Sequence, residues 1–198
     1  MSNNDKGSLP KIKLIVGLGN PQTNLLSTRH NAGYWYLDKF LNKFNTTLSE
    51  DKKLNSYFSK VDYADDQIFL VKPTFFINDS GKSVSSFSKY YKIEPESILV
   101  MHDDIDLEVG DIRLKFSGGH GGHNGLRDIT NHLGKDYWRL RIGVGHPGTK
   151  DLVHNYVLNN PSKKDAEEIS LSIGESFQLI DILLDGEFEK FTKQLHTR

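Results

Sequence analysis

Hydrophobic positions along the chain follow two different spacings, and their alternation predicts strands interleaved with helices. KIKLIV at residues 11–16 is an apolar run between polar flanks, which predicts a buried strand. NAGYWYLDKFLNKF at 31–44 instead places apolar side chains every three or four positions, which predicts an amphipathic helix. The same helical spacing recurs at 78–91 and at 123–134. The first two-thirds of the chain therefore contain three predicted helices.

Short β-prone segments separate these helices. YFSKVDY at 57–63 and QIFLVKP at 67–73 flank the turn residues ADD, which predicts a hairpin. Three further segments, 97–104, 111–116 and 137–145, are rich in β-branched and aliphatic residues between turn signals. We expect each of them to be a strand.

Strands and helices that alternate in this way predict an α/β fold, in which a twisted mixed β-sheet carries helices on both faces. The C-terminal part is expected to be helical, chiefly a long helix over 162–185 that Gly186 ends. No internal repeat and no long linker divides the chain, so a single domain is expected over 9–198. The polar residues 1–8 are expected to be a disordered tail.

Composition narrows the possible chemistry. The 198 residues contain no cysteine, which excludes disulfides, a thiolate nucleophile and cysteine-ligated zinc. No apolar run approaches the roughly 18 residues of a membrane-spanning helix, and the opening MSNNDKGSLPK lacks the apolar core of a signal peptide. We therefore expect a cytoplasmic protein with no membrane partner.

Charge is nearly balanced overall but unevenly distributed. The formal net charge is −1, so the strongly basic character of many nucleic-acid-binding proteins is missing. Residues 112–150 nevertheless carry seven Lys or Arg against two carboxylates, a net charge of +5, whereas 165–189 carry eight carboxylates and no Lys or Arg. Such runs are usually solvated faces, but the basic segment leaves room for an anionic ligand.

Two glycine-rich loops invite familiar interpretations that do not fit. GLGNPQ at 17–22 follows the first strand, as a dinucleotide-binding loop would, but Gln22 stands where that fingerprint needs glycine and Pro21 removes a backbone donor. KFSGGHGGHNGLRD at 115–128 contains His120 and His123, yet two histidines three apart in a glycine loop are weak evidence for a metal site. No GxSxG nucleophile elbow occurs in the chain.

The remaining hypothesis is a histidine that acts as a base on water. His30, in TRHNAG, lies between the first loop and the first helix, and His102 lies with Asp103 and Asp104 at the end of a predicted strand. An adjacent carboxylate can fix the tautomer of a histidine and stabilise its imidazolium form. Asn20, in GLGNP, also follows a strand, on the side where α/β sheets bind ligands.

Four stretches carry a more specific signal. They are KLIVGLGNP followed by TRHNAG, then VKPTFFINDSGKSV, ILVMHDDIDLEVGDIRLKFSGGHGGHNGLRDI and WRLRIGVGHPG, in this order between about residues 12 and 160. Together they closely resemble the bacterial peptidyl-tRNA hydrolase family. The resemblance implies a monomeric enzyme without a metal or other cofactor, whose partner is peptidyl-tRNA. Its reaction would be hydrolysis of the ester between the peptide and the 3′-terminal ribose of tRNA.

The resemblance also implies roles for individual residues. His30 would be the general base that activates water, and Asp103 would orient its imidazole. Asn20 would contact the peptide next to the ester and help to distinguish blocked from free aminoacyl groups. Five further positions would bind the substrate around the ester, the tRNA terminus and its phosphates: Phe76, Asn78, Asn124, Lys115 and Arg141.

Three positions depart from the family pattern. Leu25 stands where tyrosine is usual, Ile77 where methionine is common, and Gln22 where glycine is frequent.

Two other functions remain as alternatives: an RNA-binding module that has lost catalysis, and a metal-dependent hydrolase using His120, His123 and a carboxylate. The first would be expected to lack His30 or Asp103, and both residues are present.

Overall fold

The protein contains one mixed β-sheet between two layers of helices. The structure is a computed structural model that describes residues 9–196, so the predicted disordered tail over 1–8 lies outside the described residues. Within that range, seven strands form a single sheet in the order β2-β3-β4-β1-β5-β7-β6. Their bounds are β1 Leu14–Gly17, β2 Ser49–Asp51, β3 Ser56–Tyr63, β4 Asp66–Pro73, β5 Ile98–Asp104, β6 Ile112–Phe116 and β7 Trp138–Gly143.

Four strands at the centre of the sheet are parallel. β1 pairs in parallel with β4 and β5, and β5 pairs in parallel with β7. The hairpin of β3 and β4, the short β2 and the edge strand β6 add antiparallel pairs. The expected mixed sheet is thus confirmed, and the carboxyl ends of β4, β1, β5 and β7 meet along one edge, where loops of α/β sheets form binding sites.

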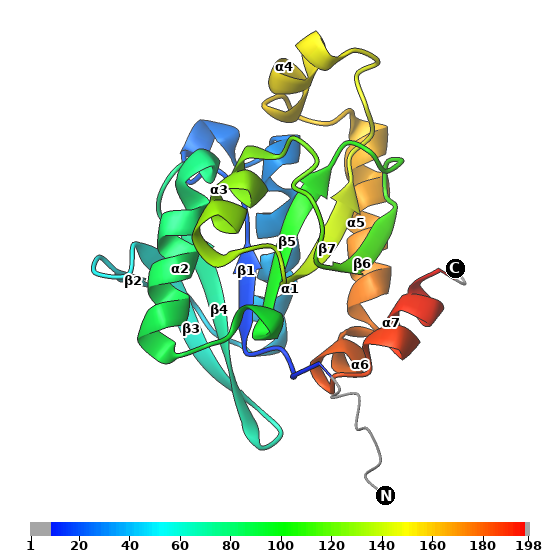
Figure 1. The fold of residues 1–198 in the computed structure, drawn as a ribbon. Helices are drawn as coiled ribbons and strands as arrows, with labels where there is room; N and C mark the ends of the chain where they lie inside the picture. Colours follow the sequence, from blue (N-terminus) through cyan, green and yellow to red (C-terminus); the bar gives the residue numbers. More distant parts are fainter. Residues whose placement is uncertain (1–8, 197–198) are drawn as a thin grey trace, which may run out of the picture.

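Helices cover both faces of the sheet (Figure 1). α2 and α3 pack on the face that receives Leu14 and Val16 of β1, whereas α1 and the C-terminal helices pack on the face that receives Ile15. The alternation of these three neighbouring residues follows from the two-residue period of a strand. The helix bounds are α1 Ala32–Lys43, α2 Ser80–Tyr91, α3 Asn124–Leu133, α4 Val153–Val157, α5 Lys163–Phe177, α6 Ile180–Leu184 and α7 Phe188–Leu195.

The long helix expected over 162–185 is divided in two. α5 ends at Phe177 and α6 begins at Ile180, with the buried Leu179 between them. α6 contributes Ile180, Leu183 and Leu184 to the same core that contains Ile169 and Ile173 of α5. The bend returns these apolar side chains to the core, so burial outweighs continuation of the helix.

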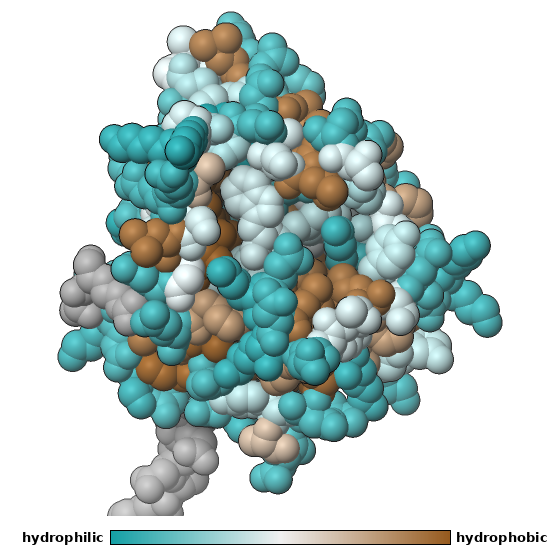
Figure 2. Space-filling view, turned by 180° about the vertical axis from the view of Figure 1, so that it is seen from behind, coloured by the Kyte–Doolittle hydropathy of each residue, from teal (hydrophilic) through white to brown (hydrophobic). Residues whose placement is uncertain are grey.

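The face that carries α1 and α5 offers no single large apolar area. In the space-filling view from behind, hydrophobic residues form several patches separated by hydrophilic ones (Figure 2). No helix within residues 9–196 is both long and apolar enough to cross a membrane.

A close contact at Gly33 sets the start of α1 against the sheet. A Cβ atom at this position would lie 2.2 Å from the carbonyl oxygen of Met101 in β5 and 2.6 Å from both the nitrogen and the oxygen of Leu18. Only glycine lets the helix approach the backbone this closely. The 3₁₀ turn Arg29–Asn31 comes just before α1 and contains His30. The contact at Gly33 therefore holds this turn beside the ends of β1 and β5.

We expect Gly33→Ala to lower the free energy of unfolding by about 1–3 kcal/mol or more, because the added methyl group has only backbone atoms to displace. Gly174→Ala is a matched control, since Gly174 lies in α5 and a Cβ atom there would meet open space. That control should raise stability by about 0.5–1 kcal/mol. Urea unfolding measures the free energy of unfolding of both variants. A negligible loss of stability for Gly33→Ala would contradict the close contact.

Candidate active site

A cleft of about 840 Å³ opens above the carboxyl ends of the parallel strands. Its walls come from the loop after β1, the 3₁₀ turn Arg29–Asn31, the end of β5, the glycine loop 117–123 and the segment around α4. All eight residues singled out from the sequence line it: Asn20, His30, Phe76, Asn78, Asp103, Lys115, Asn124 and Arg141. The structure therefore brings the whole predicted set together.

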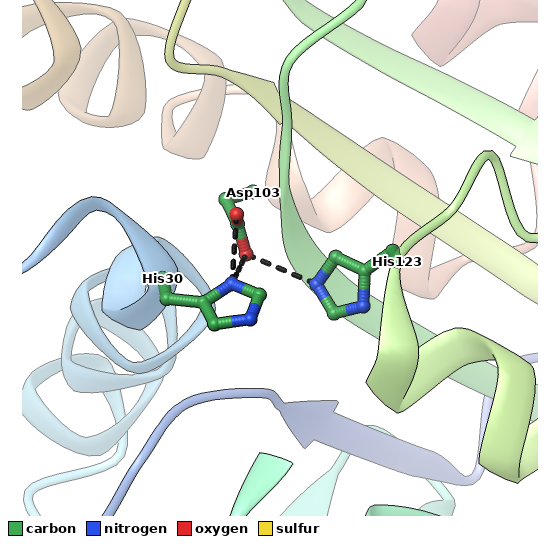
Figure 3. Close-up of side chains that lie close together, drawn as sticks. All are labelled: His30, Asp103 and His123. Carbon is green, nitrogen blue, oxygen red and sulfur yellow. Dashed lines mark hydrogen bonds and ion pairs between the residues drawn. The ribbon is translucent and has the colours of Figure 1, made fainter. Parts of the chain in front are cut away.

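His30 and Asp103 are in direct contact. Nδ1 of His30 lies 2.9 Å from both carboxylate oxygens of Asp103, a buried residue near the end of β5 (Figure 3). Because a carboxylate accepts, this Nδ1 carries the proton, and Nε2 retains the lone pair that can accept a proton. His30 is therefore held in the tautomer that a general base needs.

His123 approaches the same carboxylate from the other side. Its Nε2 donates to Oδ1 of Asp103 over 3.0 Å, and its Nδ1 accepts from the backbone N–H of Leu126, where it caps the start of α3. Both ring nitrogens are thus engaged in hydrogen bonds, which assigns His123 to holding Asp103 and α3 in place.

The pKa values of His30 and Asp103 shift in opposite directions. Burial by itself lowers the pKa of His30, but the charge of Asp103 and the hydrogen bond to it raise that pKa above its usual value. Burial by itself raises the pKa of Asp103, yet the attraction of His30 and His123 holds it well below its usual range. Asp103 therefore stays ionised wherever His30 titrates.

His102, the other candidate base, occupies a different environment. Burial and the neighbouring His123 lower the pKa of His102 to about 3, so it stays neutral at physiological pH. Its Nδ1 donates to the backbone carbonyl of Asp103 over 2.7 Å. Within the described part of the chain its Nε2 is buried without a hydrogen-bond partner. A nitrogen enclosed in this way is poorly placed to deprotonate a water, which favours His30 as the base.

Asn20 is held by a network that the sequence reasoning did not anticipate. Its Oδ1 accepts from the backbone N–H of Ile77, and its backbone N–H and carbonyl both bond to the side chain of Asn31. The carboxamide is therefore oriented, with its Nδ2 group left to donate. Asn31 is fully buried beside His30. Its position in the TRHNAG stretch is the sequence feature that could have pointed to its role.

Three other predicted residues line the cleft from two segments. Phe76 is 51% exposed and precedes the 3₁₀ turn that contains Asn78. Asn124 is the first residue of α3 and follows His123 directly. The cleft thus combines an exposed aromatic ring with two exposed carboxamides, which suits a ligand that has both a flat apolar part and polar groups.

The two predicted phosphate-binding cations differ in their surroundings. Nε of Arg141 lies 2.6 Å from Oδ2 of Asp104, so its charge is largely balanced. Burial tends to raise the pKa of Asp104, but the hydrogen bond from Arg141 and the nearby His102 lower it overall. Lys115 is exposed and forms no ion pair with another residue in 9–196. Lys115 is therefore the uncompensated positive charge of the pair.

A possible metal site is different from the one considered from the sequence. Among the described residues, His30, Asp103 and His123 have ligand atoms within 4.8 Å of one another. His120 is not part of that group, and its Nδ1 accepts from the backbone N–H of Gly122. Two imidazoles and a carboxylate suit zinc. A metal ion would, however, have to replace the hydrogen bonds that both imidazoles make to Asp103.

Comparisons with known proteins give a consistent result. The model of the family described as peptidyl-tRNA hydrolase matches residues 14–198. The peptidyl-tRNA hydrolase of Francisella tularensis subsp. novicida is 47% identical over 191 residues, which cover 96% of this chain and 100% of the relative. That of Neisseria meningitidis serogroup A is 45% identical over 188 residues, covering 94% and 98%. The crystal structure of peptidyl-tRNA hydrolase from Acinetobacter baumannii has a TM-score of 0.90 at 41% identity, covering 93% of this chain and 94% of the other.

We expect Asp103→Asn to lower the limiting rate by roughly 10²-fold or more and to move the pH dependence to lower pH. The base form of His30 is neutral, so activity should rise with pH through the His30 pKa, which Asp103 raises. Without that charge, burial lowers the pKa, and the rising limb shifts downward. The dependence of kcat/KM on pH measures the shift. An unchanged pH profile would contradict the role of Asp103 in raising the pKa of His30.

Proposed function

The chain belongs to the peptidyl-tRNA hydrolase family, whose members release tRNA from peptidyl-tRNA by ester hydrolysis, and on this premise we propose that His30 is the general base of that reaction. The single observation that carries the proposal is the hydrogen bond between His30 Nδ1 and Asp103 inside the cleft. It leaves Nε2 of His30 as the proton acceptor for a water molecule that attacks the ester carbonyl.

Asp103 supports the base through electrostatics. When Nε2 takes the proton from water, the imidazole becomes a cation next to a carboxylate 2.9 Å away. That attraction stabilises the charge which forms in the transition state, and His123 keeps the carboxylate in position. The proton can then pass to the leaving 3′-oxygen of the ribose, which restores neutral His30 and frees the tRNA.

Attack on the ester carbonyl also places negative charge on its oxygen. One well-placed donor for such an oxyanion is typically worth about 10²–10³ in rate. The Nδ2 groups of Asn20, Asn78 and Asn124 are candidate donors because all three residues line the cleft. We assign Asn20 to the peptide next to the ester, where its oriented carboxamide would distinguish a blocked aminoacyl group from a free one.

The tRNA terminus would use the rest of the cleft. The exposed ring of Phe76 offers a flat face for stacking on a base, and such stacking is worth about 1–3 kcal/mol per base. Asn78 and Asn124 would bind around the terminal ribose, and Lys115 and Arg141 would bind phosphates. A monomeric state, a cytoplasmic location and a single domain over 9–198 stay predictions.

An RNA-binding module without catalysis is the competing function. It would need the cleft and the basic residues but not an oriented base. The paired hydrogen bonds from His30 and His123 to Asp103 favour catalysis, because keeping a buried carboxylate between two imidazoles has no evident use in RNA binding. The proposal therefore stands on the base and its partner.

We expect His30→Ala to remove most turnover, by roughly 10²–10⁴-fold, while leaving the fold intact, because the base is lost and no packing group is added. The measurement is release of N-acetyl-amino acid from N-acetyl-aminoacyl-tRNA, with unblocked aminoacyl-tRNA as the control substrate. The wild type should cleave the blocked ester and spare the unblocked one.

Two outcomes of that assay would contradict the proposal. Loss of wild-type activity in a zinc-selective chelator with Mg²⁺ present, and its return with zinc, would establish a metal-dependent reaction, for which His30, Asp103 and His123 are the candidate ligands. A folded wild type that binds tRNA but cleaves nothing would establish the binding module.

We expect Lys115→Ala to raise KM and to reduce the slope of log affinity against log salt by about 0.7, the value for one contact to a single-stranded phosphate. Lys89→Ala in α2 removes the same charge outside the cleft and should change neither quantity. Arg141→Ala should raise KM too, and it also leaves Asp104 without its ion pair. Abolished turnover at saturating substrate would contradict a phosphate-binding role.

A further inference from the structure

One wall of the cleft is built by a segment with little buried surface of its own. Val153, His154 and Val157 of α4 and the following Leu158 line the cleft. Figure 1 shows α4 set apart from the sheet, above the ends of β7 and α5. Of the five residues of α4, Val157 is the buried one. Hydrophobic burial alone therefore provides little to hold this wall in one position.

The side chain of Arg29 reaches this segment from the turn that carries His30. Its Nη1 donates to the backbone carbonyl oxygens of Asn160, Asn159 and Tyr156, over 2.9, 3.2 and 3.3 Å. Its Nη2 lies 3.5 Å from Oδ2 of Asp165, in the first turn of α5. The backbone N–H of Arg29 also donates to the carbonyl of Asn159 over 3.2 Å.

Two further contacts extend the connection. The guanidinium carbon of Arg29 lies 4.0 Å from the centre of the Tyr156 ring. The hydroxyl of Tyr156 in turn donates to the carbonyl of Val144, just after β7, over 2.7 Å. Arg29 itself is 7% exposed, so these interactions are shielded from water and stronger than they would be at the surface.

The contacts need an arginine. The three carbonyls belong to Tyr156, near the C-terminal end of α4, and to Asn159 and Asn160 just after it, where the helix no longer supplies donors and a cation is favourable. A guanidinium offers several N–H donors in a fixed plane, so it can serve the carbonyls, Asp165 and the Tyr156 ring together. A lysine ammonium has the charge but not the planar fork.

We propose that Arg29 is a positioning residue which fixes the α4 wall of the cleft to the turn that presents His30. Arg29 and His30 are consecutive in one 3₁₀ turn, so the base and the anchor of the wall move as a unit. The wall thereby has one position relative to Nε2 of His30 before substrate binds. The inference rests on the proposed function of the cleft and adds a residue that determines its shape.

Loss of the anchor should act on binding more than on chemistry. If the wall is in place in about one molecule in ten, apparent affinity falls about tenfold, while bound substrate still meets an intact base. We expect Arg29→Met to raise KM about tenfold with kcat changed less than about threefold, and Arg29→Lys to give a smaller rise. The pH dependence of kcat should stay as in the wild type, because His30 keeps Asp103.

The experiment compares four variants by steady-state kinetics on N-acetyl-aminoacyl-tRNA, thermal unfolding and amide hydrogen exchange. Arg29→Met and Arg29→Lys test the anchor, and Asp165→Asn removes one of its contacts while leaving the carbonyl contacts. Lys43→Met is the matched control, since Lys43 loses an ion pair to Asp181 away from the cleft. Kinetics are measured well below the unfolding temperature of every variant.

The expected result is a raised KM together with faster exchange of the amides in 153–160 for the Arg29 variants, and neither change for Lys43→Met. A KM within about twofold of the wild type, or a fall in kcat at unchanged KM, would overturn the inference whatever the unfolding temperature. If Arg29→Met does not fold, Arg29→Lys and Asp165→Asn decide in the same way. Inactivity of the wild type would instead overturn the proposed function, and exchange would still test the anchor.

Discussion

The carboxylate of Asp103, buried between two imidazoles at the end of a central strand, is the constraint on which the site depends. An ionised group with 2% exposure is costly unless its hydrogen-bonding capacity is filled. His30 and His123 fill it from segments that are far apart in the sequence. The contact that stabilises the buried charge therefore also orients the imidazole of His30, the proposed base.

Two features of the backbone make this arrangement possible, a close approach at Gly33 and the path of the glycine loop. Gly33 lets α1 contact the ends of β1 and β5, so the turn before it delivers His30 to Asp103. On the other side, β6 runs antiparallel to β7 and ends beside its start, at the opposite edge of the sheet. The glycine loop must therefore cross the face of the sheet before His123 can cap α3 and reach Asp103.

Buried arginines hold two of the segments that line the cleft. Arg139 donates to the carbonyls of Ser117 and Gly119 in the glycine loop, as Arg29 does to the carbonyls after α4. In both cases a planar cation satisfies backbone oxygens that regular structure leaves unpaired. Three of the seven cations in the basic segment are used in this way or balanced: Arg139 by these carbonyls, Arg141 by Asp104 and Arg113 by Asp111. Lys115, Arg127 and Lys150 line the cleft without an ion pair to another residue in 9–196, so their charges are available to a ligand.

The amino-acid sequence by itself determined the α/β class, the first three helices, the hairpin and, through motif resemblance, the residues that line the cleft. These features are local: side-chain periodicity and turn residues are written into neighbouring positions. It did not reveal the break between α5 and α6, because the gain from returning Leu183 and Leu184 to the core depends on where the sheet ends. Without the resemblance, it also left His30 and His102 as alternative candidates for the base. Only the tertiary structure gave a physical reason to prefer His30, since burial and the direction of each ring nitrogen arise from residues distant in sequence. The anchoring contacts of Arg29 and the capping role of His123 have the same origin, because a side chain's partners are chosen by the folded chain and not by its neighbours in sequence.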